Sequence, residues 1–368
     1  MQNSRYFLIS MPAVAPNPNL HRRRFPGLVA WLAAPLLKPL LLCLGLRSNK
    51  KGGKVSSLTI FESYMVGDFF MALPALKKLA ARENHPPFVV LCRPDCVDLL
   101  AREGIVGIPF VNPFKVRVSA ATFLATWRAA WALRGHLGPV ALDLDADPRT
   151  AFWLKVAGVQ RVVSYRRAFN VLFDETFELP EPSVHQADKD RRVIEEWVKR
   201  EGGPGTADNG ENNPPSPLTI ANQPSAARRL PSTPWIISLW TRKATKNWPL
   251  SHWELLLGKL LTEGIPFRIL TPPDADTEFL EFQRRWAGRA EFLSGTLLEI
   301  ADVVRDSAGV IATDNFLGHM AGYYGKPVLW INLCSPEEQV TPRGPRTIVA
   351  TNPSVEEVQR AFAQLTDH

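Results

Sequence analysis

Cysteine is scarce in this sequence. The 368 residues include four, at positions 43, 92, 96 and 334, and none forms a C-x-x-C pair or lies near a set of histidines. This spacing disfavours a zinc site and a disulfide framework, and it fits buried thiols in a reducing compartment. A bridge between Cys92 and Cys96 remains the alternative.

Acidic residues are absent from the first 54 residues, which hold nine Lys or Arg. Because the whole chain has a formal charge of +7 and this stretch contributes +9, the remainder carries −2. The body is therefore close to neutral. Its basic isoelectric point does not indicate nucleic-acid binding, and we expect no nucleic-acid partner.

The same extension contains a long apolar stretch. Residues 25–46 are almost all Leu, Ala, Val and Trp, with basic residues on both flanks. Pro35, Lys38 and Pro39 disfavour a straight spanning helix. We therefore predict that residues 21–54 contact the membrane surface as an in-plane or re-entrant anchor on the cytoplasmic face. An uncleaved signal-like segment and a helix packed on the body are the alternatives.

The motif G-x-G-x-x-G opens none of the expected helices, which disfavours a dinucleotide oxidoreductase. Beyond residue 54 apolar strands alternate with helical stretches, as in parallel α/β sheets. We predict two Rossmann-like domains, residues 55–201 and 235–368, joined by a linker at 202–234 that is rich in Pro, Gly and Asn. Two such domains facing each other imply a cleft that holds the ligand.

The densest signal is residues 313–327, TDNFLGHMAGYYGKP, with an apolar run on each side. Asp314 and Asn315 read as a loop and N-cap, and residues 316–324 as a short helix before the next strand. In such a βαβ unit the free N–H groups of the helix favour a phosphate. The alternative is an ordinary capped turn.

A similar turn follows the first expected strand, residues 55–61. Gly67 permits a tight turn, and Asp68 precedes a helix expected over 69–82. At this place Asp68 either caps the helix or faces the ligand crevice, where a carboxylate can act as a base.

The loop after the first strand of the second domain, residues 240–249, combines hydroxyls with three cations. That mixture suits a diphosphate, which needs both charge neutralisation and directed donors. A solvated basic loop is the alternative. We expect Trp248 to pack the following helix and not to stack on a base.

These stretches together resemble the signatures of glycosyltransferase family 9, the ADP-heptose heptosyltransferases of lipopolysaccharide core assembly and their relatives. The resemblance is carried by residues 65–76, 241–253 and 313–327, with a weaker match over 142–165. It implies a GT-B fold, a donor held mainly by the C-terminal domain, and inverting transfer without a metal or cofactor.

The resemblance also implies roles for individual residues. Asp68 matches the proposed general base, which takes a proton from the acceptor hydroxyl. A second group matches the donor diphosphate site: Thr241, Lys246, Leu317, Gly318 and His319.

The donor sugar would be held by Asp314 and Asn315. Three further cations, Arg149, Arg242 and Lys243, are candidate contacts to the acceptor or to phosphate. The chain departs from the family at Asn315 and Phe316, where Ser or Thr followed by Gly is usual. Because the bulkier Phe316 would narrow the phosphate turn, a donor other than ADP-heptose is the alternative.

The predicted partners are a nucleoside-diphosphate sugar, with ADP-heptose favoured, a lipid-linked glycan acceptor and the membrane surface. We expect the chain on the inner face of the cytoplasmic membrane. The competing hypothesis is a catalytically silent nucleotide-sugar-binding or scaffold protein of the same fold. An intact trio of Asp68, Lys246 and Asp314 favours the enzyme, because a silent relative need not keep it.

Overall fold

The computed structural model describes residues 57–62, 65–83, 85–111, 120–166, 172–178, 184–201 and 233–366. The predicted anchor and all but the last two residues of the predicted linker lie outside these ranges.

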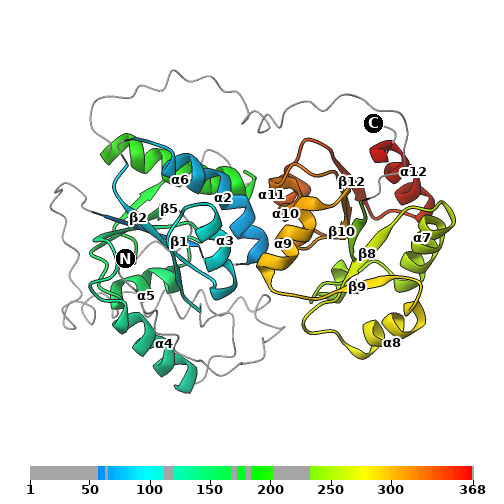
Figure 1. Cartoon of the computed structure of the whole chain (residues 1–368). Coiled ribbons are helices and arrows are strands. Elements are labelled where there is room, and N and C mark those ends of the chain that lie inside the picture. Colours follow the sequence, from blue (N-terminus) through cyan, green and yellow to red (C-terminus); the bar gives the residue numbers. More distant parts are fainter. Residues whose placement is uncertain are drawn as a thin grey trace, which may run out of the picture.

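The first half of the described chain forms a parallel six-stranded sheet in the order β3-β2-β1-β4-β5-β6 (Figure 1). Its central strands are runs of buried residues, as expected for a sheet covered on both faces. The strands are β1 (Leu58–Glu62), β2 (Phe88–Cys92), β3 (Gly107–Pro109), β4 (Val140–Asp143), β5 (Arg161–Tyr165) and β6 (Glu175–Phe177).

Two helical layers cover this sheet. Apolar residues of α2 (Val66–Ala80), α3 (Val97–Arg102) and α6 (Gln186–Glu201) share one core cluster. Those of α4 (Ala120–Ala132) and α5 (Pro148–Val156) belong to another. In Figure 1, α2 and α6 lie above the sheet and α4 and α5 below it.

The second half repeats the design with the sheet order β12-β11-β10-β7-β8-β9, again all parallel. The strands are β7 (Trp235–Ser238), β8 (Phe267–Leu270), β9 (Glu291–Leu293), β10 (Gly309–Thr313), β11 (Val328–Asn332) and β12 (Thr347–Thr351). The helices are α7 (Leu250–Thr262), α8 (Thr277–Trp286), α9 (Leu297–Asp306), α10 (Phe316–Tyr323), α11 (Glu337–Val340) and α12 (Val355–Thr366).

The two sheets have the same topology. Counted within its own half, each follows the order 3-2-1-4-5-6 of a doubly wound Rossmann sheet. The strand order reverses between β1 and β4 in one half and between β7 and β10 in the other. Ligands of such sheets bind at the carboxyl ends of the strands beside this reversal.

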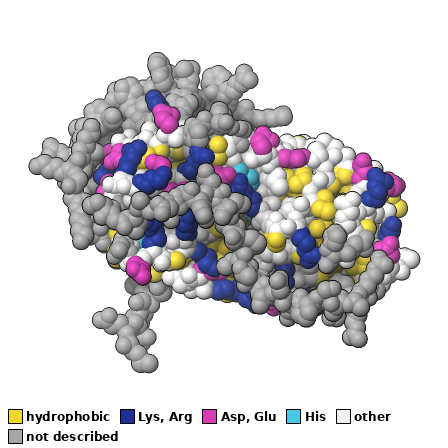
Figure 2. Space-filling view, turned by 90° about the horizontal axis from the view of Figure 1, so that it is seen from above, with side chains coloured by type: hydrophobic (Ala, Val, Ile, Leu, Met, Phe, Trp, Pro, Cys, Tyr) yellow, Lys and Arg dark blue, Asp and Glu magenta, His cyan; other side chains and the backbone are white. Residues whose placement is uncertain are grey.

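The halves, called here the N-terminal and C-terminal lobes, pack directly on each other. One hydrophobic cluster includes α2 and α3 of the first lobe and α9 and α10 of the second. The Phe70 ring lies 5.8 Å from that of Tyr323, and Arg102 donates to Asp302 at 2.8 Å. Seen from above, basic side chains and a patch of histidine mark the junction (Figure 2).

Both buried cysteines, Cys92 and Cys96, are free thiols, so the alternative of a bridge between them is wrong. Burial raises the pKa of Cys92 to about 12, and the thiol stays protonated.

Candidate active site

The predicted site residues follow the strands that flank the two reversals. Asp68 comes after β1, Arg149 after β4, the loop with Lys246 after β7, and Asp314 after β10. Each therefore lies at the carboxyl edge of its sheet, where the fold places ligands.

Asp314 joins the two parts of the C-terminal site. Its Oδ2 forms an ion pair with Nζ of Lys246 and accepts a hydrogen bond from Oγ of Ser335. The Asp314 side chain is only 8% exposed and that of Lys246 21%. Because a buried charge is costly unless paired, this cation and carboxylate stabilise each other in the ligand-free chain.

Asn315 caps α10, as predicted. Its Oδ1 accepts from the N–H of Leu317 at 2.9 Å, and its Nδ2 donates to Oγ of Ser238 at 2.8 Å. The cap uses one amide of the predicted phosphate-binding turn. By helix geometry the amides of Phe316 and Gly318 remain in the first turn without a partner inside the helix.

Gly318 has a second constraint. A Cβ there would lie 2.9 Å from Cγ of Pro342 and 3.3 Å from the Trp330 ring. The missing side chain lets the loop at Pro342 pack against α10. The sequence reading gave Gly318 only the phosphate role and overlooked this packing.

The loop after β7 is folded on itself. The N–H and hydroxyl of Thr241 donate to Oδ1 of Asn247 at 2.7 and 2.8 Å, and Nδ2 of Asn247 donates back to Thr241 O at 3.1 Å. This closure holds the short 3₁₀ turn Ala244–Lys246 in place. Arg242 instead points to Asp274 at 2.7 Å, and both Arg242 and Lys243 are exposed.

Trp248 packs the helix, as predicted. It is 2% exposed, its ring meets that of Trp253 edge to face at 5.2 Å, and its Nε1 donates to Pro353 O.

His319 lies where the lobes meet. A Cβ at Gly67 would stand 3.1 Å from its Cδ2, so the start of α2 rests on this imidazole. Burial lowers the pKa of His319 to about 4, against a smaller raising effect of Asp314, and the ring is neutral at pH 7. Its Nδ1 has no hydrogen-bond partner among the described residues.

Asp68 follows Gly67 in the first turn of α2 and is partly buried. The N-cap of α2 is Met65, so the interpretation of Asp68 as a simple cap is wrong. The Gly67 contact brings the start of α2 onto α10, the helix that follows Asp314. The structure thus brings the turn of Asp68 against α10, the helix predicted to bind phosphate.

The edge of the N-terminal sheet is acidic. Burial raises the pKa of Asp143 to about 7, although the Thr150 hydroxyl and the N–H of Asp145 donate to it. Arg149 is held by Asp147, which also caps α5. Arg149 is therefore committed to a local ion pair in the ligand-free chain.

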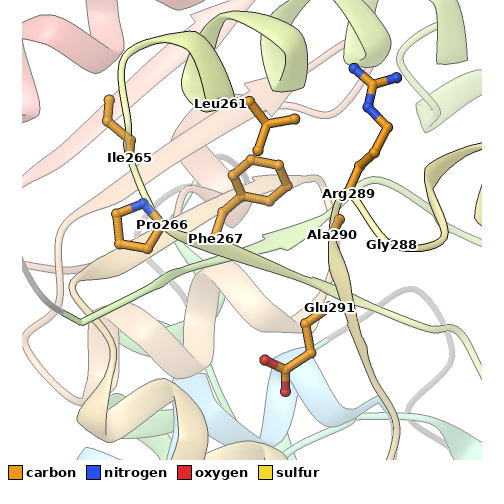
Figure 3. A pocket seen from close by; sticks show the side chains of 8 residues that line it. All are labelled: Leu261, Ile265, Pro266, Phe267, Gly288, Arg289, Ala290 and Glu291. Atoms are coloured by element: carbon orange, nitrogen blue, oxygen red, sulfur yellow. The ribbon is translucent and has the colours of Figure 1, made fainter.

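A shallow hollow elsewhere is separate from this site. It is lined by Leu261, Phe267, Arg289 and Glu291 among others (Figure 3). These residues precede or begin β8 and β9 or end the helices before them, which places the hollow at the amino edge of the sheet.

Sequence reasoning missed three polar residues of the site: Ser238, Asn247 and Ser335. Each follows or ends a strand of the C-terminal sheet near a predicted residue. Position after a strand was the available signal for Ser335, which comes three residues after β11.

No protein-family model matches the chain, and no curated protein does. Solved structures do match. E. coli heptosyltransferase WaaC with ADP is 18% identical, with a TM-score of 0.66 over 84% of this chain and 99% of that one. E. coli ADP-heptose lipopolysaccharide heptosyltransferase II is 17% identical, with a TM-score of 0.62 over 84% and 98%.

A glycosyltransferase of family 9 from Veillonella parvula is 14% identical, with a TM-score of 0.63 over 84% and 97% of the two chains. The chain therefore has the GT-B fold, and the predicted resemblance to these enzymes is confirmed at the level of the fold.

Proposed function

We propose that the chain is an inverting, metal-independent glycosyltransferase. It moves a heptose or related sugar from a nucleoside-diphosphate sugar to a lipid-linked glycan acceptor of the lipopolysaccharide type, and it needs no cofactor. The observation that carries this proposal is the contact between Gly67 and His319, because it sets the turn of Asp68 against the helix that follows Asp314.

The acceptor side needs a base. The Asp68 carboxylate takes the proton of an acceptor hydroxyl as its oxygen attacks C1 of the donor sugar. The bond from C1 to the diphosphate oxygen breaks in the same step, and the nucleoside diphosphate leaves from the opposite face. One displacement of this kind inverts the configuration at C1.

The donor side must neutralise the leaving group. Lys246 carries the positive charge, and the α10 amides of Phe316 and Gly318 add directed donors. When a diphosphate takes over the ammonium of Lys246, the carboxylate of Asp314 is released to accept hydrogen bonds from sugar hydroxyls. Ser335 keeps that carboxylate oriented during the exchange.

The domain roles follow from these positions. Residues 55–201 bind the acceptor, residues 235–368 bind the donor, and residues 21–54 hold the enzyme at the inner face of the cytoplasmic membrane. Among the described residues no helix is long and apolar enough to cross a membrane. The structures of E. coli WaaC with ADP and with ADP-2-deoxy-2-fluoro heptose support the donor class.

The test has two stages. Thermal unfolding with ADP, GDP, UDP and their sugar conjugates identifies the donor, because a ligand at 100 times its Kd stabilises by about 2.7 kcal/mol. The preferred conjugate is then incubated with lipid-linked glycan, and release of nucleoside diphosphate is compared with and without acceptor. Acceptor-dependent release supports the enzyme, whereas binding without release supports the silent scaffold.

A further inference from the structure

Helix α4 has large apolar side chains that stay exposed among the described residues, although the Phe123 ring also packs on Trp153 of α5 at 5.2 Å. Leu124 is 54% exposed, Trp131 48% and Phe123 38%. The opposite side of the helix is small and buried, with Thr126 5% and Ala130 0% exposed. Large side chains therefore lie on the outer side of the helix as well as at its contact with α5, unlike the polar outer side of an ordinary surface helix.

Three aromatic rings form a row along α4, in which Phe123 and Trp131 are exposed and Trp127 is half-buried against Phe152 of α5. The rings of Phe123, Trp127 and Trp131 follow one another at successive centroid separations of 6.3 Å, and the last two are stacked. The guanidinium of Arg134 lies 3.6 Å above the Trp131 ring, and its Nε donates to Val156 O at 3.0 Å. The row is fixed before any partner arrives and ends in a cation.

The sequence segment that contains this row carries charge of one sign. The chain has 36 acidic residues, yet none occurs between Glu103 and Asp143. The same stretch has four basic residues, Lys115, Arg117, Arg128 and Arg134. Because the chain beyond residue 54 carries −2 overall, this segment contrasts with the rest of the body.

We propose that α4 is a membrane-docking helix, which lies on an anionic bilayer with Phe123, Leu124 and Trp131 in the interface and Arg128 and Arg134 at the headgroups. Apolar and aromatic side chains flanked by arginine are typical of helices that lie in the plane of the interface. Helix α4 lies at the outer side of the lobe, below α5 in Figure 1, where a flat bilayer surface can approach it.

Residues 1–54 carry nine basic residues and no acidic one, so they share the sign of the α4 face. Lipid headgroups supply both the negative charge and the adjoining apolar layer. This inference does not depend on the transferase activity or on the predicted anchor.

The orientation is useful to the lobe. A helix that connects two parallel strands runs opposite to them, so the start of α4 lies toward the carboxyl edge of the sheet. Phe123 and Leu124 are in that first turn, and Asp68 lies at the same edge. Docking through α4 therefore brings the acceptor side of the crevice toward the bilayer.

The first experiment measures the environment of α4 directly, in the full chain, with a fluorescent probe. Cys43 and Cys334 are replaced by Ser, and an environment-sensitive fluorophore is attached at Leu124→Cys. The matched control is Leu255→Cys on α7, where Leu255 is 62% exposed. On vesicles of phosphatidylcholine and phosphatidylglycerol in equal parts, the α4 probe should brighten several-fold and be quenched by brominated lipid, and the α7 probe should not.

Three results overturn the proposal. The α4 probe remains dim on vesicles; or it is already bright without them, which means that another part of the chain covers the face; or it brightens only with polyglutamate, which indicates an acidic protein partner.

The second experiment removes the apolar and basic character of the exposed side of α4. Leu124→Glu/Arg128→Glu changes two exposed residues four apart on α4, and Leu255→Glu/Lys259→Glu makes the same change at the same spacing on α7. Titration of the full chain with the anionic vesicles, read by co-sedimentation, should give an affinity on the order of ten-fold lower for the α4 variant, because α4 adds to the binding of residues 21–54, and an affinity near wild type for the α7 variant. Equal losses in both variants contradict a specific docking helix.

Discussion

The two lobes share one topology and differ in the chemistry at the carboxyl edge. In the N-terminal lobe, the carboxyl edge of the sheet carries carboxyl groups, including Asp68, the buried Asp143 and Asp147. In the C-terminal lobe, the same edge carries Lys246 and a set of hydroxyl and amide groups around Asp314. The fold fixes where a ligand lies, and the side chains decide which ligand. Carboxylates suit the removal of a proton, and a cation with directed donors suits a diphosphate.

The largest effect on activity is expected at Asp68, the proposed general base of the N-terminal lobe. Asp68→Asn should keep donor binding and reduce transfer about 10²–10⁴-fold, because an amide keeps the shape and cannot accept a full proton. Steady-state release of nucleoside diphosphate and calorimetric titration of the donor measure the two quantities. Asp98→Asn, in the first turn of the exposed start of α3, is the matched control. Near-normal turnover of the Asp68 variant would remove its role as base.

The next effect is expected on the donor side. Lys246→Ala should weaken nucleoside-diphosphate binding about ten- to a hundred-fold, the value of one charge-assisted contact of 1.5–3 kcal/mol. The ligand-free protein should also unfold at lower temperature, since Asp314 loses its cation. Lys243→Ala, an exposed cation of the same loop, should change neither quantity much.

A double variant separates the two consequences of losing Lys246. Lys246→Ala/Asp314→Asn should recover most of the thermal stability, because no unpaired buried carboxylate remains, and it should not recover affinity. Equal small losses for Lys243→Ala and Lys246→Ala would show a diffuse basic patch.

Ser335 tests a residue that the sequence reading missed. Ser335→Ala should raise the KM for the donor roughly three- to ten-fold with a smaller change in kcat, because Asp314 keeps Lys246 and loses one hydrogen bond. Ser307→Ala is the control, since Ser307 is a buried serine of the same lobe that donates to the carbonyl of Val304. A larger effect on kcat than on KM would place Ser335 in the chemical step.

The sequence was sufficient to predict most of the architecture. Strands such as Phe88–Cys92 and Phe267–Leu270 are short apolar runs followed by turn residues, so the alternation of strands and helices that predicts an α/β fold is visible in the sequence. The edge strands β6, β9 and β12 were missed. Each is short or only partly buried, with patterns such as Glu291 exposed beside half-buried Phe292, so hydrophobic periodicity gives little signal there.

The site was predictable where chemistry follows a strand and was not where tertiary contact decides it. Lys246 and Asp314 are 68 positions apart, and their ion pair depends on β7 and β10 lying side by side. Met65 was missed as the N-cap of α2 because its side chain makes no capping bond; its carbonyl accepts from Phe69 N–H at 3.0 Å. Such a backbone cap leaves no mark in residue type.

The smallest expected effect concerns Asp143. Burial raises its pKa from 3.8 to about 7, so the folded chain holds this proton more tightly than the unfolded chain does. The stabilising contribution is complete below pH 3.8 and is lost as the pH rises through 7. The amide in Asp143→Asn does not ionise, so the pH-dependent contribution of this residue is removed. Its amide oxygen can still accept a hydrogen bond from the N–H of Asp145.

The free energy of unfolding of Asp143→Asn relative to wild type should therefore increase by about 2–3 kcal/mol between pH 5 and pH 8, with turnover unchanged. Urea unfolding at pH 5, 6, 7 and 8 measures the difference, and Asp98→Asn should show none. In the wild type the hydroxyl of Thr150 donates to Asp143 and lowers the pKa of that carboxyl. The variant Thr150→Val removes this hydroxyl, so the pKa of Asp143 should rise and the loss of stability should extend to higher pH. If the difference in free energy of unfolding between Asp143→Asn and wild type did not change with pH, Asp143 would be ionised over the whole range. The N-terminal lobe would then carry one more negative charge at the ligand edge of its sheet, and the two lobes would differ in charge more strongly than a protonated Asp143 implies.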